Sequence, residues 1–461
     1  MDLPFISIII LNYNGAHFLP ACLDALDSQT YPKDQFEVIV SDNGSNDGSL
    51  HLLKDDYPWV RVLENGKNLG FASGNNVAIK HANGEYKVLL NNDTAPTDDW
   101  LEELVKTARS HPGAGMVTGH LQMFYNQVDL RLEASTFVPP GDDRSLGIQV
   151  LNVDSSTPRG VVQYLDGFYG KELGPSGESF RWTNAASLLG VPVPQGSGDW
   201  PLELKLAAPR PQTQDVLLKI YVNDTLLDEW TVSASQQNYR LTLPASSRDL
   251  AGPLEQNTGS IIFRNGSGRD RGTFVRDFEL FHETDTKQYD QEEEVFAGCG
   301  ASLLLKQDML NDVGLLDDEF FMYYEDTDLS WRARLRDWSV YYAPNAVVRH
   351  IHCGTSKEWS PFFLYLTERN RLAMVFKNGA VKQVTRVWGG YTLKVARLAW
   401  KILVSLLTLK PDWRTNGGRL RVHLHVMATL FLWQPALWRK RYRIQKGKKI
   451  SHRQLAGWFK E

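Results

Sequence analysis

Cysteine and long apolar runs are both scarce in this sequence of 461 residues. The three cysteines, Cys22, Cys299 and Cys353, lie far apart and show no CxxC spacing. Such cysteines favour neither a disulfide framework nor a cysteine-based zinc site, so they indicate a reducing compartment. No segment offers about 18 uninterrupted apolar residues, which disfavours a membrane-spanning helix.

The first residues also lack the basic region that begins a signal peptide. Their apolar run, residues 5–11, is too short to cross a membrane and is typical of a buried strand. The sequence therefore predicts a cytoplasmic location. The chain is 42% hydrophobic and long, which predicts folded cores arranged in two or three units.

Charge is distributed unevenly along the chain. Residues 380–461 hold 18 Lys and Arg against Asp412 and Glu461, a balance of +16, which leaves −20 for residues 1–379. A basic end on an acidic body predicts an anionic partner surface, either phospholipid or nucleic acid. Two Trp-bearing apolar segments, 391–409 and 422–438, favour helices that lie in a membrane interface. We therefore expect residues 381–461 to bind the inner face of the cytoplasmic membrane, and we expect no nucleic acid partner.

Apolar strands alternate with helical patterns in the first 150 residues. The candidate strands are 5–11, 36–40, 60–63 and 86–90, and the candidate helices include 16–28 and 75–81. This alternation predicts an α/β domain with a mostly parallel sheet. Ligands of such sheets bind at the carboxyl ends of the strands.

Short alternating strands separated by turn residues replace this pattern after about residue 154. They include 202–206, 216–222, 229–232, 239–243, 260–263 and 274–281. The pattern predicts an all-β sandwich over 154–286. Trp182, Trp200 and Trp230 could stack on sugar rings there, but we favour a place in its core. Helical periodicity returns near residue 295, so we expect the sandwich to be inserted into the α/β domain.

Polar residues follow three of the candidate strands. Asp42, with Asn43, ends the second strand; its carboxylate can accept the imide N–H of uracil or thymine, or it can form an Asx-turn. The segment 68–76, rich in glycine and asparagine, permits close approach of an anion to the backbone, and we favour a ligand contact there. Asn91, Asn92 and Asp93 follow the strand 86–90, and Asp93 could hold Mg²⁺ or Mn²⁺ on a diphosphate or merely form a turn.

Three carboxylates crowd together in Glu325-Asp326-Thr327-Asp328, beside an aromatic run. Mutual repulsion and loss of water raise at least one pKa, and such a carboxylate can take a proton from an acceptor hydroxyl. Asp328 suits helix capping, which leaves Asp326 and Glu325 for chemistry. His350 and His352 alternate along a strand and face opposite ways, so at most one reaches a metal.

In this order, the motifs resemble those of family 2 glycosyltransferases, especially the rhamnosyltransferase-like and galactofuranosyltransferase-like branch. The matching segments are SIIILNYNG, VIVSDNGSNDGS, KNLGFASGNN, LLNNDT, FAGCGASLLL, FFMYYEDTDLSWRARLRDW and VRHIHCGTS. The resemblance covers residues 5–150 and about 290–380. It implies a GT-A fold, with 1–153 as the nucleotide-sugar half and 287–380 as the acceptor and catalytic half.

The resemblance also implies roles for individual residues. The nucleotide-sugar site would comprise Leu11, Asn12, Tyr13, Asp42, Asn43, Asn68, Gly70, Gly74, Asn91 and Asn92. Asp93 and His350 would bind the divalent cation, Mn²⁺ or Mg²⁺, with His352 as the fallback. Asn91 stands where the family has a first metal-binding acid. Asp326, beside Glu325, would be the base.

The implied reaction is a direct displacement that inverts the anomeric centre. A UDP- or dTDP-sugar, rhamnose among the candidates, would pass to a glycan or polyprenyl-linked glycan in cell-surface polysaccharide synthesis. The QxxRW motif of processive synthases is missing, which favours transfer of a single sugar. The alternatives are a non-catalytic glycan-binding scaffold and a sugar nucleotidyltransferase, although no glycine-rich triphosphate loop occurs near residue 12.

Overall fold

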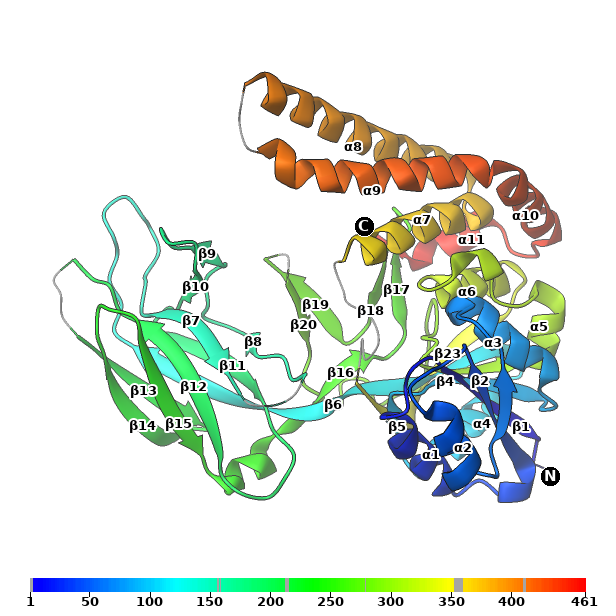
Figure 1. The fold of residues 1–461 in the computed structure, drawn as a ribbon, viewed down its shortest axis with the longest axis horizontal. Helices are drawn as coiled ribbons and strands as arrows, with labels where there is room; N and C mark the ends of the chain where they lie inside the picture. Colours follow the sequence, from blue (N-terminus) through cyan, green and yellow to red (C-terminus); the bar gives the residue numbers. More distant parts are fainter. Residues whose placement is uncertain are drawn as a thin grey trace. The chain divides into compact units, whose positions relative to one another are not determined.

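The computed structural model describes residues 3–155, 157, 159–211, 215–277, 279–351, 360–408 and 412–461, without the side chains of 412–415. The chain forms two compact units. The first comprises Met1–Gln122, Asn257–Arg271 and Tyr289–Glu461, and the second comprises Met123–Gln256 and Gly272–Gln288. Each is described by itself below, with the elements labelled as in Figure 1.

A mixed sheet lies at the centre of the first unit, with strand order β6-β22-β4-β1-β2-β3. Its strands are β1 (Ile6–Asn12), β2 (Phe36–Asp42), β3 (Arg61–Glu64), β4 (Tyr86–Asn91), β6 (Ala114–Ala134) and β22 (Ser302–Lys306). The first four are parallel, whereas β22 runs antiparallel to both β4 and β6. The α/β prediction is confirmed, and the sheet is mixed because strands from later in the chain join it in the opposite direction.

Helices cover both faces of this sheet. One face carries α1 (Leu19–Asp27), α2 (Ser49–Asp56) and α4 (Trp100–Ser110), and the other carries α3 (Gly70–His81), α5 (Gln307–Val313) and α6 (Glu325–Leu335). Ile8 and Ile9 are both fully buried, although they point to opposite faces of β1. A strand that is covered on both faces has a nearly continuous apolar sequence, which explains the apolar run of residues 5–11.

Helix α3 begins at Gly70, five residues before the predicted start at residue 75. Gly70 has a φ of +80°. The N–H groups of Phe71 and Ala72, at the start of the helix, donate to the carbonyl oxygen of Phe321, 2.5 and 3.2 Å away. A partner distant in sequence thus satisfies the first turn, and glycine composition alone could not reveal it.

The second unit is built from strands. Its two sheets share one apolar core and comprise β7 (Gln149–Asp154), β8 (Gln163–Tyr164), β9 (Glu172–Leu173), β10 (Ser179–Trp182), β11 (Ala186–Pro192), β12 (Trp200–Ala207), β13 (Val216–Val222), β14 (Thr225–Val232) and β15 (Gln237–Leu243), together with the end of β6. Trp182 and Trp200 are buried, whereas Trp230 is half-buried and stacks on Tyr239. The structure therefore gives the first two tryptophans places in the interior.

The limits of this unit differ from the expected 154–286. The chain enters it within β6, at Met123, because a single 21-residue strand continues from the first unit into the second. The chain returns to the first unit over residues 257–271, where β17 (Ser260–Phe263) and β18 (Gly268–Asp270) form a hairpin. The predicted strand 274–281 is instead a hairpin of β19 (Thr273–Arg276) and β20 (Glu279–His282), because Asp277 turns with a φ of +52°.

The C-terminal region is helical and belongs to the first unit. Its helices are α7 (Pro361–Asn378), α8 (Val381–Leu407), α9 (Asp412–Leu432), α10 (Gln434–Gly447) and α11 (His452–Leu455). They share an apolar core with α6, and the final strand β24 (Phe459–Lys460) pairs with β17. The apolar segment 422–438 is divided at Trp433, the N-cap of α10, and Pro435 lies in the first turn of that helix. Within the described ranges, no helix combines the length and apolarity needed to cross a bilayer.

Candidate active site

Asp42 lies where β1 and β2 end side by side. Its Oδ2 accepts a hydrogen bond from Nδ2 of Asn12 at 3.0 Å, and its Oδ1 accepts from the N–H groups of Gly44 and Ser45 at 3.0 and 2.8 Å. The side chain therefore forms the Asx-turn that was one of its two interpretations. A carboxylate has about four acceptor positions, and these hydrogen bonds fill three of them.

Asn92 extends this network toward β4. Its Nδ2 donates to Oδ1 of Asn12 at 2.8 Å, while Nδ2 of Asn12 also donates to Ser45 at 3.1 Å. The structure thus brings Asn12, Asp42 and Asn92 together as a buried polar layer beneath the strand ends.

Asn43 and the glycine-rich segment form a second polar cluster. The Nδ2 group of Asn43 donates to the carbonyl of Gly70 at 3.1 Å and to Oδ1 of Asn68 at 3.3 Å. A Cβ on Gly70 would lie 2.5 Å from the ring of Phe321, and one on Gly74 would lie 2.4 Å from Cδ1 of Leu11. Close packing alone therefore requires glycine at both positions, whether or not a ligand also approaches them.

Four of the predicted nucleotide-sugar residues reach solvent. Tyr13 is 42% exposed, Asn68 is exposed, and Leu11 and Asn91 are partly exposed. They belong to the ends of three neighbouring elements, β1, the turn before α3, and β4. This rim is the part of the predicted site that a ligand can touch without displacing protein.

Asp93 and His350 are brought together by strand pairing. Strand β23 (Ser339–His350) runs antiparallel to β5 (Thr94–Pro96), with His350 opposite Thr94. As a result, Nε2 of His350 lies 3.2 Å from Oδ1 of Asp93 and 3.3 Å from Nδ2 of Asn91. His352 lies outside the described residues.

The pair formed by Asp93 and His350 fits a divalent cation. Neighbouring ligands of an octahedral ion bound at about 2.1 Å lie about 3 Å apart, close to the separation seen here. A carboxylate oxygen and an imidazole nitrogen are ligands that Mn²⁺ accepts, and Mg²⁺ needs few protein ligands when phosphate oxygens supply the rest.

Glu325 is the first residue of α6 and is buried. Its Oε2 has no hydrogen-bond partner among the described residues. Burial, followed by the charges of Asp326 and Asp328, raises the pKa of Glu325 well above its usual value. These surroundings favour the protonated acid.

Asp326 follows in the first turn of α6 and is only half-buried. Its Oδ2 accepts the N–H of Gly300 at 3.0 Å, and its Oδ1 accepts the N–H and hydroxyl of Thr327 at 2.6 and 3.1 Å. Burial raises the pKa of Asp326, and these hydrogen bonds oppose that rise. Asp326 therefore combines some solvent access with a raised proton affinity, as a general base requires.

The loop before β22 links this carboxylate to the end of β4. The carbonyl of Ala301 accepts the N–H of Asn91 at 3.2 Å, and the N–H of the preceding Gly300 donates to Asp326. A Cβ on Gly300 would lie 3.1 Å from the ring of Phe71. The adjacent residues Gly300 and Ala301 thus connect Asp326 with the end of β4, which Asp93 follows. The motif was recognised in the sequence, but this role of its glycine was not.

The aromatic loop before α6 has an unfavourable backbone. Phe321, Tyr323 and Tyr324 have φ values of +60°, +72° and +69°. Positive φ is a genuine outlier for a bulky side chain, and each instance costs about 1–3 kcal/mol. Such a loop persists only where its surroundings fix it, and outliers of this kind gather at functional sites.

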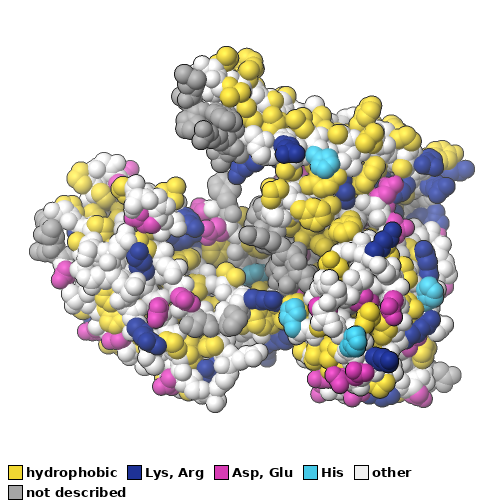
Figure 2. Space-filling view, viewed as in Figure 1, with side chains coloured by type: hydrophobic (Ala, Val, Ile, Leu, Met, Phe, Trp, Pro, Cys, Tyr) yellow, Lys and Arg dark blue, Asp and Glu magenta, His cyan; other side chains and the backbone are white. Residues whose placement is uncertain are grey.

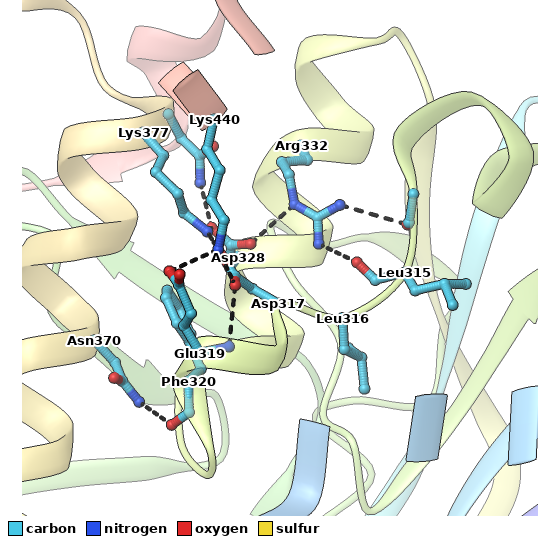
Figure 3. Close-up of polar contacts among 12 residues, drawn as sticks. Leu315, Leu316, Asp317, Glu319, Phe320, Asp328, Arg332, Asn370, Lys377 and Lys440 are labelled. Carbon is cyan, nitrogen blue, oxygen red and sulfur yellow. Dashed lines mark hydrogen bonds and ion pairs between the residues drawn. The ribbon is translucent and has the colours of Figure 1, made fainter. Parts of the chain in front are cut away.

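Asp328 does not cap α6, contrary to the prediction. It is fully buried, and its carboxylate lies 2.9 Å from Nε of Arg332 and 2.9 Å from Nζ of Lys377. Figure 3 shows how Lys377, from α7, reaches both Asp328 and Asp317. The side chain is one turn too deep in the helix to cap it, and it joins α6 to α7.

Helix α10 contributes to the same group of charges. Lys440 pairs with Asp317 and, at 2.7 Å, with Glu319 (Figure 3). Although burial would raise it, the charges of Lys377 and Lys440 hold the pKa of the Asp317 carboxyl well below its usual range. The C-terminal helices are thus tied directly to the segment that leads into the aromatic loop.

Residues 7–157 match the family model described as glycosyl transferase family 2. The chain is 36% identical over 126 residues to glycosyltransferase AglE of Haloferax volcanii. The aligned residues cover 27% of this chain and 41% of AglE. The N-terminal part is therefore similar to family 2 glycosyltransferase domains. The chain spans about two fifths of this relative.

One further relative and one solved structure are less similar to this chain. The Methanococcus voltae enzyme named dolichyl N-acetyl-alpha-D-glucosaminyl phosphate 3-beta-D-2,3-diacetamido-2,3-dideoxy-beta-D-glucuronosyltransferase is 29% identical over 108 residues, 22% of this chain and 33% of its own. The solved mannosyltransferase PcManGT of Pyrobaculum calidifontis, in complex with GDP-Man and Mn²⁺, is 13% identical with a TM-score of 0.40, covering 94% of this chain and 88% of that one.

Proposed function

We propose that this chain is an inverting, metal-dependent glycosyltransferase that transfers one sugar from a UDP- or dTDP-sugar to a glycan or lipid-linked glycan. One observation carries the proposal. The paired ligands Asp93 and His350 and the half-buried carboxylate Asp326 are linked through the adjacent residues Gly300 and Ala301. Asp93 follows the parallel strand β4 closely, at the carboxyl end where α/β domains bind ligands.

Asp326 is the proposed base. A raised pKa gives its carboxylate a greater affinity for the proton of an acceptor hydroxyl. The deprotonated oxygen attacks the anomeric carbon in line, the bond to the diphosphate breaks, and the configuration inverts. Burial and the charge of Asp326 raise the pKa of the neighbouring Glu325, which favours its neutral form beside the proposed base.

Asp93 and His350 are the residues that would hold a divalent cation, Mn²⁺ or Mg²⁺. A bound cation would stabilise the negative charge of the departing diphosphate. The rim formed by Tyr13, Asn68 and Asn91 is the proposed contact surface for the nucleotide sugar. Its mixture of an aromatic ring and amides suits a base, a ribose and a sugar.

The proposed acceptor is a growing glycan, free or linked to a polyprenyl lipid, in cell-surface polysaccharide synthesis. The name of the Methanococcus voltae relative specifies a dolichyl phosphate-linked sugar acceptor, which supports a lipid-linked glycan. The resemblance to the rhamnosyltransferase-like branch supports dTDP-rhamnose as one donor to test.

The proposed partner of residues 381–461 is the inner face of the cytoplasmic membrane. Large apolar side chains stay exposed on α8 and α9, including Trp400 at 67% and Leu407, Phe431 and Leu432 at 76%. Figure 2 shows apolar side chains gathered along these helices, with Lys and Arg among them. Such a surface matches the apolar interior and the anionic headgroups of an interface.

The proposal is tested by a donor screen with the full chain. UDP- and dTDP-sugars, dTDP-rhamnose included, are incubated with and without Mn²⁺, and nucleotide release is measured. We expect release from one donor class that depends on the metal. Binding of glycans without turnover of any donor would favour the scaffold instead, and consumption of nucleoside triphosphate would favour a nucleotidyltransferase.

A further inference from the structure

We propose that Asn370, in α7, is a positioning residue that holds the donor-binding helix α3 and the base-bearing helix α6 in their working arrangement. The inference rests on the proposed function and deepens it. Asn370 does not touch the predicted reacting groups. It acts through the aromatic loop 320–324, whose backbone contacts both helices.

Asn370 makes several hydrogen bonds to this loop with one side-chain amide. It is fully buried, and its Nδ2 group lies 2.9 Å from the carbonyl oxygen of Phe320, 2.8 Å from that of Met322 and 2.8 Å from that of Tyr323. Figure 3 shows the amide directed at Phe320. The two N–H groups of one amide thus serve three carbonyl groups of one short segment.

Arg369 fixes the orientation of that amide. Its Nε donates to Oδ1 of Asn370 at 2.9 Å, so Nδ2 must face the loop; the reverse orientation would place oxygen against three carbonyl oxygens. Its Nη2 donates to the carbonyl of Phe320 at 3.0 Å. The guanidinium is itself held over the ring of Trp433, 4.7 Å from its centroid. The Asn370 amide therefore has one orientation only.

The loop held in this way joins the two halves of the site. The carbonyl of Phe321 accepts the first N–H groups of α3, from Phe71 and Ala72. At its other end, Tyr324 precedes Glu325 and Asp326 directly and has a positive φ. Because the backbone between these points is strained, it relaxes when its anchors are removed. Relaxation would shift both the donor-binding segment and the base.

The test compares Asn370→Ala with Asn378→Ala. Asn378 is also fully buried in α7, but its Nδ2 donates to the side chain of Asp328 at 2.8 Å and, among the described residues, makes no hydrogen bond to the loop. The first measurement is amide hydrogen exchange in the metal-free protein without donor. We expect the Phe71 and Ala72 amides to exchange about tenfold faster in Asn370→Ala and at the wild-type rate in Asn378→Ala.

The second measurement is steady-state transfer by the full chain. A displacement of about 1 Å can cost about a hundredfold in rate, so we expect kcat to fall about tenfold to a hundredfold in Asn370→Ala. The KM for the donor rises as well, because α3 is released. Asn378→Ala lowers the midpoint of thermal unfolding but keeps kcat and KM within about twofold of the wild type.

The two measurements separate the possible failures. Unchanged exchange at Phe71 and Ala72 in a folded Asn370→Ala protein overturns the positioning role, whatever the activity. Loss of kcat to the same extent in both variants also overturns it. Faster exchange together with a wild type that turns over no donor would retain the structural coupling but reject the proposed function.

A milder variant covers the case in which Asn370→Ala does not fold. Arg369→Lys keeps the positive charge but loses the fork that reaches Asn370 and Phe320 together. We expect the same amides, Phe71 and Ala72, to exchange about threefold faster or more. Exchange at the wild-type rate in this folded variant overturns the inference.

Discussion

At the scale of single residues, the two neighbouring acids of α6 have different surroundings. Glu325 is buried with one carboxyl oxygen unpartnered, whereas Asp326 receives three hydrogen bonds and keeps some contact with solvent. Both pKa values are raised, Glu325 well above its usual range. The larger rise at Glu325 follows from its deeper burial and missing hydrogen-bond partner, whereas hydrogen bonds oppose the rise at Asp326.

Removing the charge of Asp326 tests its role as base. Asp326→Asn keeps the size of the side chain but cannot take a proton, so we expect kcat to fall by about a hundredfold to ten-thousandfold. Nucleotide binding, measured by calorimetry, stays within about threefold, because the residue is not on the proposed nucleotide rim. The exposed Asp337→Asn is the matched control. Full activity of Asp326→Asn would exclude the residue as base.

The pH dependence follows from the direction of the same pKa. The base works when unprotonated, so kcat/KM rises with pH as Asp326 loses its proton. Because its pKa is raised above 3.8, the half-maximum of this acid limb lies above pH 3.8. The measurement is a pH–rate profile over the range in which circular dichroism shows the protein folded. An acid limb at or below pH 3.8 would contradict the assignment.

Some residues could be placed from the sequence and others could not. Asp93 and His350 were paired by motif, and strand register then brings them into contact. Asn370 and Lys377 drew no attention, since a polar residue in a helix usually faces water. Lys377 follows Asn370 by seven residues and Asn378 follows it by eight, about two helical turns, and this spacing is a signal of a buried polar stripe that could have revealed them.

At the scale of elements, buried charges hold α6, α7 and α10 together. Lys377 is 1% exposed in its side chain and reaches both Asp317 and Asp328. Removal of one member leaves a carboxylate that is buried with too little compensating charge. The Asp317 pKa is lowered, so its contribution to stability is present above its unfolded pKa and is lost as pH falls.

Lys377→Met tests this element-level anchor. The substitution removes the central cation, and breaking a buried ion pair in this way costs about 3–5 kcal/mol of unfolding free energy. Urea denaturation followed by fluorescence gives the change. The exposed Lys382→Met, at the start of α8, should change the free energy by less than about 0.5 kcal/mol. Equal stability of the two variants would show that the buried cluster contributes no net stability.

Elements of the sheet were largely predictable because their apolar runs are buried on both faces. The start of α3 was not, since it depends on a hydrogen bond from Phe71 to Phe321, 250 positions later in the chain. The β19–β20 hairpin was missed because Asp277 turns without a glycine or proline beside it. Local patterns therefore fail where a distant partner or an unusual backbone angle decides the structure.

At the scale of the whole molecule, the basic C-terminal region is not a separate appendage. Its helices share an apolar core with α6, and Lys440 reaches the segment before the aromatic loop. Composition revealed the charge and the apolar content of this region but not these contacts. Its outer surface still carries Trp400 and Leu407 exposed to solvent.

Vesicle flotation tests the proposed membrane surface. We expect the chain to float with vesicles that contain anionic phospholipid and to dissociate partly as salt rises, because screening weakens the electrostatic part. Trp400→Gln combined with Leu407→Gln should weaken binding about tenfold, since two exposed apolar anchors are lost. Equal binding of this variant, or preferential binding of duplex DNA, would contradict the membrane assignment.

The most direct test of the central claim is the metal response of donor turnover in the wild type and in Asp93→Asn. A cation on the diphosphate contributes several kcal/mol, so EDTA should lower wild-type nucleotide release about a hundredfold, and Mn²⁺ should restore it. Asp93→Asn should stay at the EDTA level at Mn²⁺ concentrations that saturate the wild type. Wild-type turnover that persists in EDTA, or full activity of Asp93→Asn, would contradict the account.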